Sequence, residues 1–340
     1  MSRDYSDADN DWLDDKAGRP RPKSSAKKPL EGRAKVLPPE QGNATVAELF
    51  PNQSAVRLDG RTDVTLCAYR MSTLASRGPG RERSPVCVGD RVRIEAGVII
   101  GRCERRNRLI RPAPNAHNPL LHALVANVDR LVVVAAARQP DFSAGIIDRF
   151  LVAASAQAIP SVLCVNKTDL LEAGAERPWA RYADAGIAVI EASALKQRGI
   201  DALMALLRGK AAVFCGHSGV GKTSLLRRLL ADANFGRTGA VNASSGMGRH
   251  TTTGAVLLPG PGDSVWIDTP GIMNFGLIDV QRESLLPHFP ELARAAARCQ
   301  PGCAHAEEPS CALRALPRYH SYRQILASLP EPLRGPTGDT

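Results

Sequence analysis

The eight residues Gly216–Thr223, which read GHSGVGKT, fit the pattern G-x-x-x-x-G-K-[ST] and constrain the fold more than any other stretch. The pattern needs a strand before it and a helix after it, and the chain has an apolar run at 211–215 and a helix-like segment at 224–230. In such a P-loop the backbone N–H groups surround phosphates, the lysine reaches the β- and γ-phosphates, and the next hydroxyl holds Mg²⁺. A glycine-rich turn without a ligand is the alternative. The predicted phosphate-binding residues are Gly216, His217, Ser218, Gly219, Val220, Gly221, Lys222, Thr223 and Ser224, with Thr223 as the magnesium ligand.

A second motif indicates which base the nucleotide carries. The strand-like run 161–165 leads into Asn166-Lys167-Thr168-Asp169, which matches N-K-x-D. A carboxylate at Asp169 can accept hydrogen bonds from N1–H and the exocyclic amine of guanine, whereas adenine has no such pair of donors. Another strand-like run, 187–190, is followed by Ser193 and Ala194, the usual loop behind a guanine. We therefore predict binding of GTP and GDP, and we disfavour an ATP-driven P-loop enzyme.

The motifs occur in an unusual order along the chain. Asp268-Thr269-Pro270-Gly271 follows a strand-like run, as expected where Asp268 holds Mg²⁺ through water and the N–H of Gly271 meets the γ-phosphate. The guanine-reading loops precede the P-loop, whereas an ordinary GTPase has them after it. Circular permutation is tolerated where chain ends lie close together. We therefore expect a circularly permuted α/β GTPase domain with a mostly parallel sheet over residues 113–280.

Three cysteines and a histidine near the C-terminus predict a metal site. Cys299, Cys303, His305 and Cys311 supply three thiolates and one imidazole, a complete tetrahedral zinc set with no open position for catalysis. Three free cysteines crowded by chance are the alternative. Helix-like segments at 284–298 and 311–316 are too short for a large core, so we expect a helical domain at 281–328 that a structural zinc ion stabilises.

The residues before the GTPase motifs predict a tail and a barrel. Residues 1–42 begin acidic and turn basic, which is typical of a disordered charged tail, and residues 329–340 are expected to be a second tail. Five short strand-like runs separated by turn signals lie within residues 43–112, and they predict a barrel of the OB type. The surface of such a barrel commonly takes nucleic acid; a module that docks on protein is the alternative.

Composition limits the partners and the location. The formal net charge of +10 favours a polyanionic partner such as RNA. The most apolar run, 131–137, is far shorter than the roughly 20 residues that span a membrane, and the N-terminus lacks the features of a signal peptide. We therefore expect a cytoplasmic monomer.

The permuted guanine-binding domain, the barrel before it and the Cys/His cluster after it together resemble the ribosome small subunit-dependent GTPase A family of bacteria, over about residues 43–328. The resemblance implies a GTPase that binds the small (30S) ribosomal subunit and its 16S rRNA, is stimulated by the subunit and acts late in its assembly. A nucleotide-gated RNA-binding scaffold with incidental hydrolysis is the alternative. The resemblance also covers Gly89-Asp90-Arg91-Val92, Arg105-Arg106-Asn107, Gly248-Arg249-His250-Thr251-Thr252-Thr253 and Arg318-Tyr319-His320-Ser321-Tyr322.

The chain departs from the family's motifs at three places. His217 stands where the family usually has glutamine, and Thr223 replaces a serine but keeps the hydroxyl. Three residues separate Cys299 from Cys303, where the family usually has four. None of these changes removes a predicted ligand.

The residue that positions the attacking water is the least obvious part of the site. Many GTPases have a glutamine directly after the D-x-x-G glycine, but this chain has Ile272, which cannot orient water. The candidate is His250, because it precedes three threonines in the loop expected to close over the γ-phosphate, and the resembling family is thought to use its matching histidine in this way. One of Thr251, Thr252 and Thr253 should complete the Mg²⁺ shell. A surface histidine that contacts rRNA is the alternative.

Overall fold

The computed structural model describes residues 36–69, 82, 84–112, 121–233, 235, 254–269 and 275–330. All of them belong to one compact unit that begins at Arg33. His250, the three threonines after it and Gly271 lie outside the described residues, as does most of both predicted tails. No helix in the described part of the chain has the length and apolar character needed to cross a membrane.

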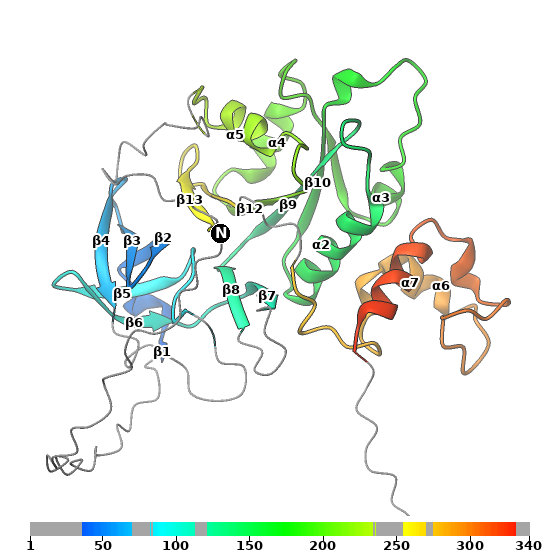
Figure 1. Cartoon of the computed structure of the whole chain (residues 1–340), viewed down its shortest axis with the longest axis horizontal. Helices are drawn as coiled ribbons and strands as arrows, with labels where there is room; N and C mark the ends of the chain where they lie inside the picture. The colour runs from blue at the N-terminus through cyan, green and yellow to red at the C-terminus, as the bar shows by residue number, and fades with distance from the viewer. Residues whose placement is uncertain are drawn as a thin grey trace, which may run out of the picture. The chain divides into compact units, whose positions relative to one another are not determined.

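The first part of the described chain is a closed barrel (Figure 1). Its five strands are the five that the sequence predicted, and their order is β4-β3-β2-β5-β6, with β6 returning to β4. The β4–β6 pairing is parallel and the other pairings are antiparallel. Alternate side chains such as Val46, Val56 and Val92 fill the interior, which confirms the predicted barrel. The strands are β2 (Ala44–Phe50), β3 (Gln53–Leu58), β4 (Val64–Tyr69), β5 (Arg91–Glu95) and β6 (Val98–Cys103).

Three further strands near the barrel were not predicted. A two-residue strand, β1 (Val36–Leu37), pairs with β6. The other two, β7 (Arg108–Pro112) and β8 (Leu121–Ala126), pair with each other in a separate two-stranded sheet. This hairpin spans the boundary expected at residues 112 and 113, and the boundary itself stays a prediction.

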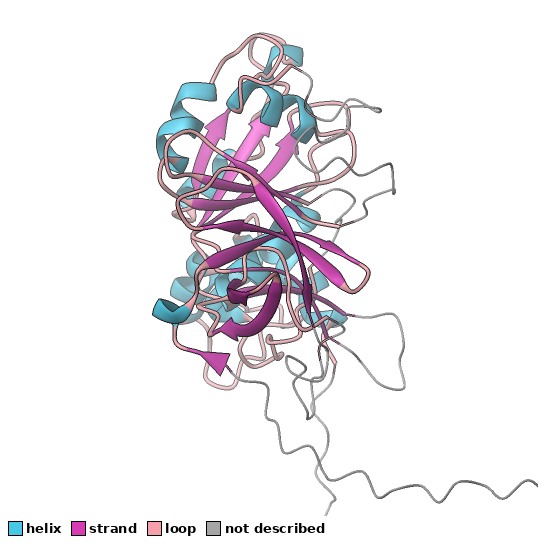
Figure 2. Ribbon diagram, turned by 90° about the vertical axis from the view of Figure 1, so that its left-hand side faces the viewer, coloured by secondary structure: helices cyan, strands magenta, loops and turns pink. Residues whose placement is uncertain are grey.

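The central sheet has the order β11-β10-β9-β12-β14-β13, and all its pairings are parallel except that of β13 with β14. This confirms the predicted mostly parallel α/β sheet. Figure 2 shows the strands of the chain in magenta and its helices in cyan. The strands are β9 (Arg130–Ala136), β10 (Ser161–Asn166), β11 (Ala188–Glu191), β12 (Ala211–Cys215), β13 (Val256–Pro259) and β14 (Val265–Asp268).

Helices cover both faces of this sheet because successive strand residues point to opposite sides. Val133 and the residues of β9 that point to the same side pack in the apolar cluster that contains α2. Val132 and the residues of β9 that point to the opposite side pack in the cluster that contains α4 and α5. The helices of this domain are α2 (Ala144–Ala156), α3 (Ala180–Asp184), α4 (Ile200–Leu207) and α5 (Lys222–Leu229).

The C-terminal part is helical, as predicted, but its elements are shorter than the sequence suggested. The helix expected at 284–298 begins only at Pro290, and the segment expected at 311–316 is a single 3-10 turn. The elements are a 3-10 turn at Leu286–His288, α6 (Pro290–Ala296), the turn Ala312–Ala315 and α7 (Tyr319–Ser328). Their apolar side chains, including Phe289 and Tyr322, share one buried cluster with α2. The domain therefore has an apolar anchor on α2 in addition to its Cys/His cluster.

Candidate nucleotide site and metal centre

The P-loop connects β12 to α5 as predicted. Strand β12 ends at Cys215 and α5 begins at Lys222, so residues 216–221 form the loop between them. Gly221 has a φ of 87°, and a Cβ there would lie 2.4 Å from Nδ2 of Asn166. Because an L side chain would be strained and would clash, this glycine is required for the loop to approach the N-K-x-D strand so closely.

Asp268 lies beside the P-loop because β12 and β14 are neighbours with Phe214 opposite Asp268. The Lys222 Nζ atom is 3.4 Å from Asp268 Oδ1 and donates a hydrogen bond to the Thr269 carbonyl at 3.1 Å. Burial raises the pKa of Asp268, and the nearby Lys222 opposes that rise. Apart from this ion pair with Lys222, the buried Asp268 Oδ1 has no partner among the described residues. A buried acceptor of this kind is suited to a metal-bound water.

Asn166 of the N-K-x-D motif connects the P-loop with the Ser193–Ala194 loop. It is 2% exposed, and its Nδ2 donates to the Val220 carbonyl of the P-loop at 3.0 Å. Its Oδ1 accepts a hydrogen bond from the Ala194 N–H, also at 3.0 Å. Ser193 in the same loop donates its hydroxyl to Asp169. The side chain of Asn166 therefore fixes the guanine-side loop and the P-loop relative to each other.

The structure brings the described members of the predicted nucleotide set to one edge of the sheet. They follow the carboxyl ends of β10, β11, β12 and β14, where ligands bind in open α/β sheets. His250 and Gly271 lie outside the described residues, so their predicted roles remain predictions.

Two parts of this edge were missed from the sequence. The main-chain carbonyl of Gln139 accepts a hydrogen bond from the Lys167 ammonium group, and Arg228 donates from Nε to the Ala194 carbonyl at 2.9 Å. Gln139 follows the apolar run 131–137, which forms β9. This strand lies between β10 and β12, which lead into the N-K-x-D loop and the P-loop, so the position of Gln139 after that run was the available signal. Nothing in the sequence distinguishes Arg228 from an ordinary helical arginine.

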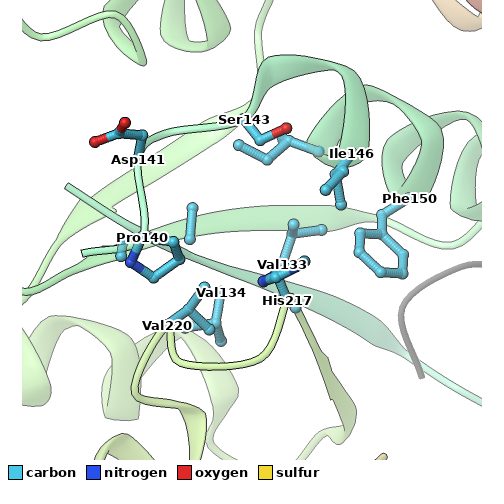
Figure 3. A pocket seen from close by; sticks show the side chains of 13 residues that line it. Val133, Val134, Pro140, Asp141, Ser143, Ile146, Phe150, His217 and Val220 are labelled. Atoms are coloured by element: carbon cyan, nitrogen blue, oxygen red, sulfur yellow. The ribbon is translucent and has the colours of Figure 1, made fainter. Parts of the chain in front are cut away.

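A mostly apolar cavity of about 200 Å³ lies beside the P-loop (Figure 3). The strand β9, the start of α2 and the loop before α2 form its walls, together with the P-loop residues Gly216, His217 and Val220. The side chain of His217 reaches this cavity, and its Nδ1 lies 2.9 Å from the Ser218 carbonyl. The first turns of α2 are therefore direct neighbours of the phosphate-binding loop.

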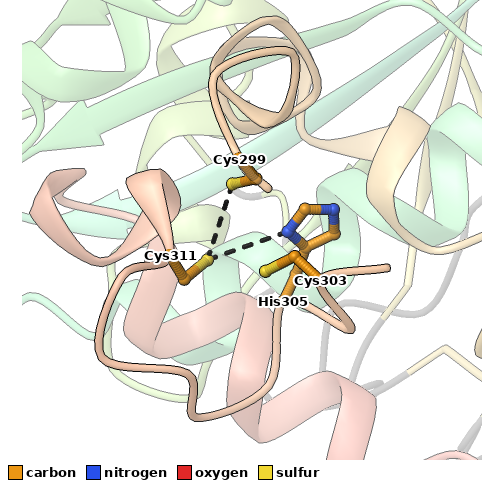
Figure 4. A group of neighbouring side chains, drawn as sticks. All are labelled: Cys299, Cys303, His305 and Cys311. Carbon is orange, nitrogen blue, oxygen red and sulfur yellow. Dashed lines mark hydrogen bonds between the residues drawn. The ribbon is translucent and has the colours of Figure 1, made fainter. Parts of the chain in front are cut away.

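The predicted metal ligands converge in the C-terminal domain (Figure 4). The ligand atoms of Cys299, Cys303, His305 and Cys311 all lie within 4.8 Å of one another. The Cys299 and Cys311 sulfurs are 3.9 Å apart, close to the roughly 3.8 Å expected between two corners of a tetrahedron with Zn–S bonds of about 2.3 Å. The Ala312 N–H also lies 3.3 Å from Cys299 Sγ, as expected of a donor that stabilises a thiolate. The donor set and its spacing therefore fit a metal ion.

Comparison with known proteins agrees with this architecture. A family model described as RsgA GTPase matches residues 102–278. A relative from Azotobacter vinelandii, named Small ribosomal subunit biogenesis GTPase RsgA, is 38% identical over 328 residues, which cover 91% of each chain. A relative of the same name from Pseudomonas aeruginosa is 38% identical over 329 residues, covering 92% of this chain and 91% of the relative.

Two solved structures are similar in fold to this chain. The crystal structure of YjeQ from Thermotoga maritima is 28% identical, with a TM-score of 0.63, and the match covers 84% of this chain and 97% of that one. YloQ, described as a circularly permuted GTPase, matches with a TM-score of 0.57 at 24% identity and supports the fold alone. These matches confirm the permuted fold and the resemblance found in the motifs. The chain belongs to the RsgA GTPase family, a family of GTP-hydrolysing enzymes.

Proposed function

We propose that this protein hydrolyses GTP as a switch in the late assembly of the small ribosomal subunit. The observation that carries the proposal is the meeting of the N-K-x-D loop, the P-loop and Asp268 at one edge of the sheet despite their permuted order. The relatives that match most of the chain are named small ribosomal subunit biogenesis GTPases. In this proposal the enzyme is a cytoplasmic monomer that binds 16S rRNA.

The nucleotide is held from two sides. Asp169 accepts from the guanine, and the Ser193–Ala194 loop, fixed by Asn166, lies behind the base. The backbone of residues 216–221 and the first turn of α5 hold the phosphates, with Lys222 on the β- and γ-phosphates. In this scheme the nucleotide takes over the contact between Lys222 and the Thr269 carbonyl.

Thr223 and Asp268 are the residues that would hold magnesium, Asp268 through a water molecule. The residues fit because the Thr223 hydroxyl is at the start of α5 and the buried Asp268 Oδ1 has only the Lys222 ammonium as a partner among the described residues. When bound, Mg²⁺ would neutralise charge on the phosphates. In this proposal Thr223 and Asp268 help to orient the γ-phosphate, and the ion pair with Asp268 keeps Lys222 beside it.

The metal of the C-terminal domain is zinc in this proposal, and it is structural. We expect about one zinc ion per chain, because three thiolates and an imidazole form a closed set of four ligands. His305→Ala should lose the metal and make the segment 299–311 sensitive to protease, whereas His320→Ala, a change at an exposed histidine of the same domain, should keep both metal and resistance. Metal analysis and limited proteolysis measure these effects. Metal-free preparations of the intact wild-type protein would contradict the assignment.

Binding to rRNA should make the activity sensitive to salt. Lys and Arg side chains that contact phosphates release counterions, so affinity for the subunit should fall steeply as salt rises. The test is the rate of GTP hydrolysis with small subunits at increasing salt, with large subunits as the control. Stimulation that is specific to the small subunit and declines with salt supports the proposal. Stimulation independent of salt would instead indicate docking on a ribosomal protein.

A further inference from the structure

An arginine in the C-terminal domain is buried against the GTPase domain. Arg318, just before α7, has a side chain 1% exposed, and its Nε donates to Asp148 Oδ1 on α2 at 2.8 Å. The Asp148 side chain is 0% exposed. Glu291 of α6 accepts from the other end of the guanidinium at 3.0 and 3.2 Å. A buried charge is costly unless it is paired, so loss of one partner leaves the other strongly destabilised.

Aromatic rings complete the surroundings of this guanidinium. Its central carbon lies 5.1 Å from the ring centre of Tyr182 and 4.7 Å from that of Phe289, within the range of cation–π attraction. Tyr182 comes from α3 of the GTPase domain, whereas Phe289 precedes α6. Arg318 therefore bonds to the C-terminal domain on one side and to two helices of the GTPase domain on the other.

The same two turns of α2 that hold Arg318 also form a wall beside the P-loop. Ile146, Ile147 and Phe150 line the cavity next to the P-loop, and Asp148 lies between Ile147 and Phe150 in the sequence. Figure 3 shows Ile146 and Phe150 at this wall. A helix places residues one and two apart on different sides, so the pair with Arg318 and the P-loop wall lie on different sides of the same turns. Movement of this part of α2 would therefore change the wall of the P-loop.

The segment just before α2 is connected to the same group of residues. Phe142 packs edge-on against Tyr182, with ring centres 6.1 Å apart, and the Tyr182 hydroxyl donates to the Ala144 carbonyl at 3.4 Å. Two residues before Phe142, Pro140 lies close to Gly219 of the P-loop, and the main-chain carbonyl of Gln139 accepts a hydrogen bond from Lys167. The aromatic partner of Arg318 thus also fixes the segment that touches both nucleotide motifs.

We propose that Arg318 is a positioning residue for the nucleotide site. It holds the start of α2, and through Tyr182 the segment 139–144, in the place where they support the P-loop and Lys167. This inference rests on the proposed function, because it assumes that GDP and GTP bind at the P-loop. It also gives the C-terminal domain a role in nucleotide affinity that does not depend on its metal ligands, which lie in the segment 299–311.

The test compares arginine variants in the full-length protein without ribosomal subunits. Arg318→Met should speed the release of a fluorescent GDP about tenfold and lower basal kcat several-fold, since residues that touch neither ligand can change the coupling between two sites to about this extent. The matched control is Arg323→Met. Arg323 is on α7, the helix that follows Arg318, and pairs with Glu307 inside the C-terminal domain, so its loss should change neither rate.

Two further variants separate positioning from general destabilisation. Arg318→Lys keeps a positive charge opposite Asp148 and should release GDP at a rate between those of the wild type and Arg318→Met. Arg318→Met leaves the buried Asp148 carboxylate without its charged partner, and adding Asp148→Asn removes that charge. The double variant should therefore release GDP at a rate closer to that of the wild type than Arg318→Met alone. Zinc content should remain at its wild-type value in all variants.

The outcomes distinguish this inference from the proposed function. GDP release and kcat at wild-type values in Arg318→Met, with only a lower melting temperature, would overturn the positioning role and leave the proposed function intact. Should Arg318→Met fail to fold, wild-type GDP release in both Arg318→Lys and Asp148→Asn would overturn it equally. A wild-type protein that binds no guanine nucleotide would overturn the proposed function, and this inference with it.

Discussion

Asp169→Asn should lower the affinity for GTP about 100-fold and raise the affinity for xanthosine triphosphate. The two hydrogen bonds from guanine to the carboxylate are charge-assisted, and each such bond contributes about 1.5–3 kcal/mol. An amide presents a donor that suits the 2-oxo group of xanthine and repels the amine of guanine. Titration calorimetry with both nucleotides measures the change.

The control for this experiment is Asp184→Asn, which alters an exposed carboxylate at the end of α3 in the same domain. It should leave both affinities unchanged. Because Ser193 also donates to Asp169, a fall in melting temperature of the Asp169 variant should be measured separately. An unchanged affinity for GTP in Asp169→Asn would contradict the assignment of this carboxylate to the base.

His250→Ala should reduce the subunit-stimulated kcat by about 100-fold or more while leaving the affinity for GTP nearly unchanged. A group that orients the attacking water acts mainly in the transition state, so its loss lowers kcat and barely affects ground-state binding. The measurement is GTP hydrolysis on saturating small subunits together with a binding titration.

Lys222→Ala gives the contrasting pattern and serves as the comparison for His250→Ala. Lys222 belongs to the P-loop, forms an ion pair with Asp268 and would contact the phosphates of bound GTP. Its loss should therefore weaken the binding of GTP itself. Hydrolysis at the wild-type rate by His250→Ala on saturating subunits would show that the histidine mechanism is wrong. The catalytic group would then come from the ribosome.

The fold was predicted best where a local pattern determines it. The barrel strands are short runs bounded by turns such as Asp59-Gly60, and the central strands are apolar runs too short for helices. The pairing of β7 with β8 was missed, because residues 113–120 between them carry prolines that indicated only a linker. The very short β1 was missed because two residues carry no periodicity.

The site was predicted best where a motif carries the chemistry. The P-loop, the N-K-x-D loop and the four metal ligands are each contiguous or closely spaced, so their grouping can be read along the chain. Arg318 was singled out only as part of the stretch 318–322, and nothing in the sequence connected it with Asp148, which is 170 positions away. Their burial depends on how the C-terminal domain packs against α2. Contacts of this kind come from tertiary packing, and residue spacing does not reveal them.

Single-turnover hydrolysis of GTP by the wild-type protein, with and without saturating small subunits, tests the central claim most directly. An enzyme whose permuted motifs form one site should hydrolyse GTP and not ATP, and it should do so markedly faster when the small subunit is present. Large subunits should give no such acceleration. A rate for GTP that small subunits leave unchanged would contradict the claim and would favour a nucleotide-gated scaffold whose hydrolysis is incidental.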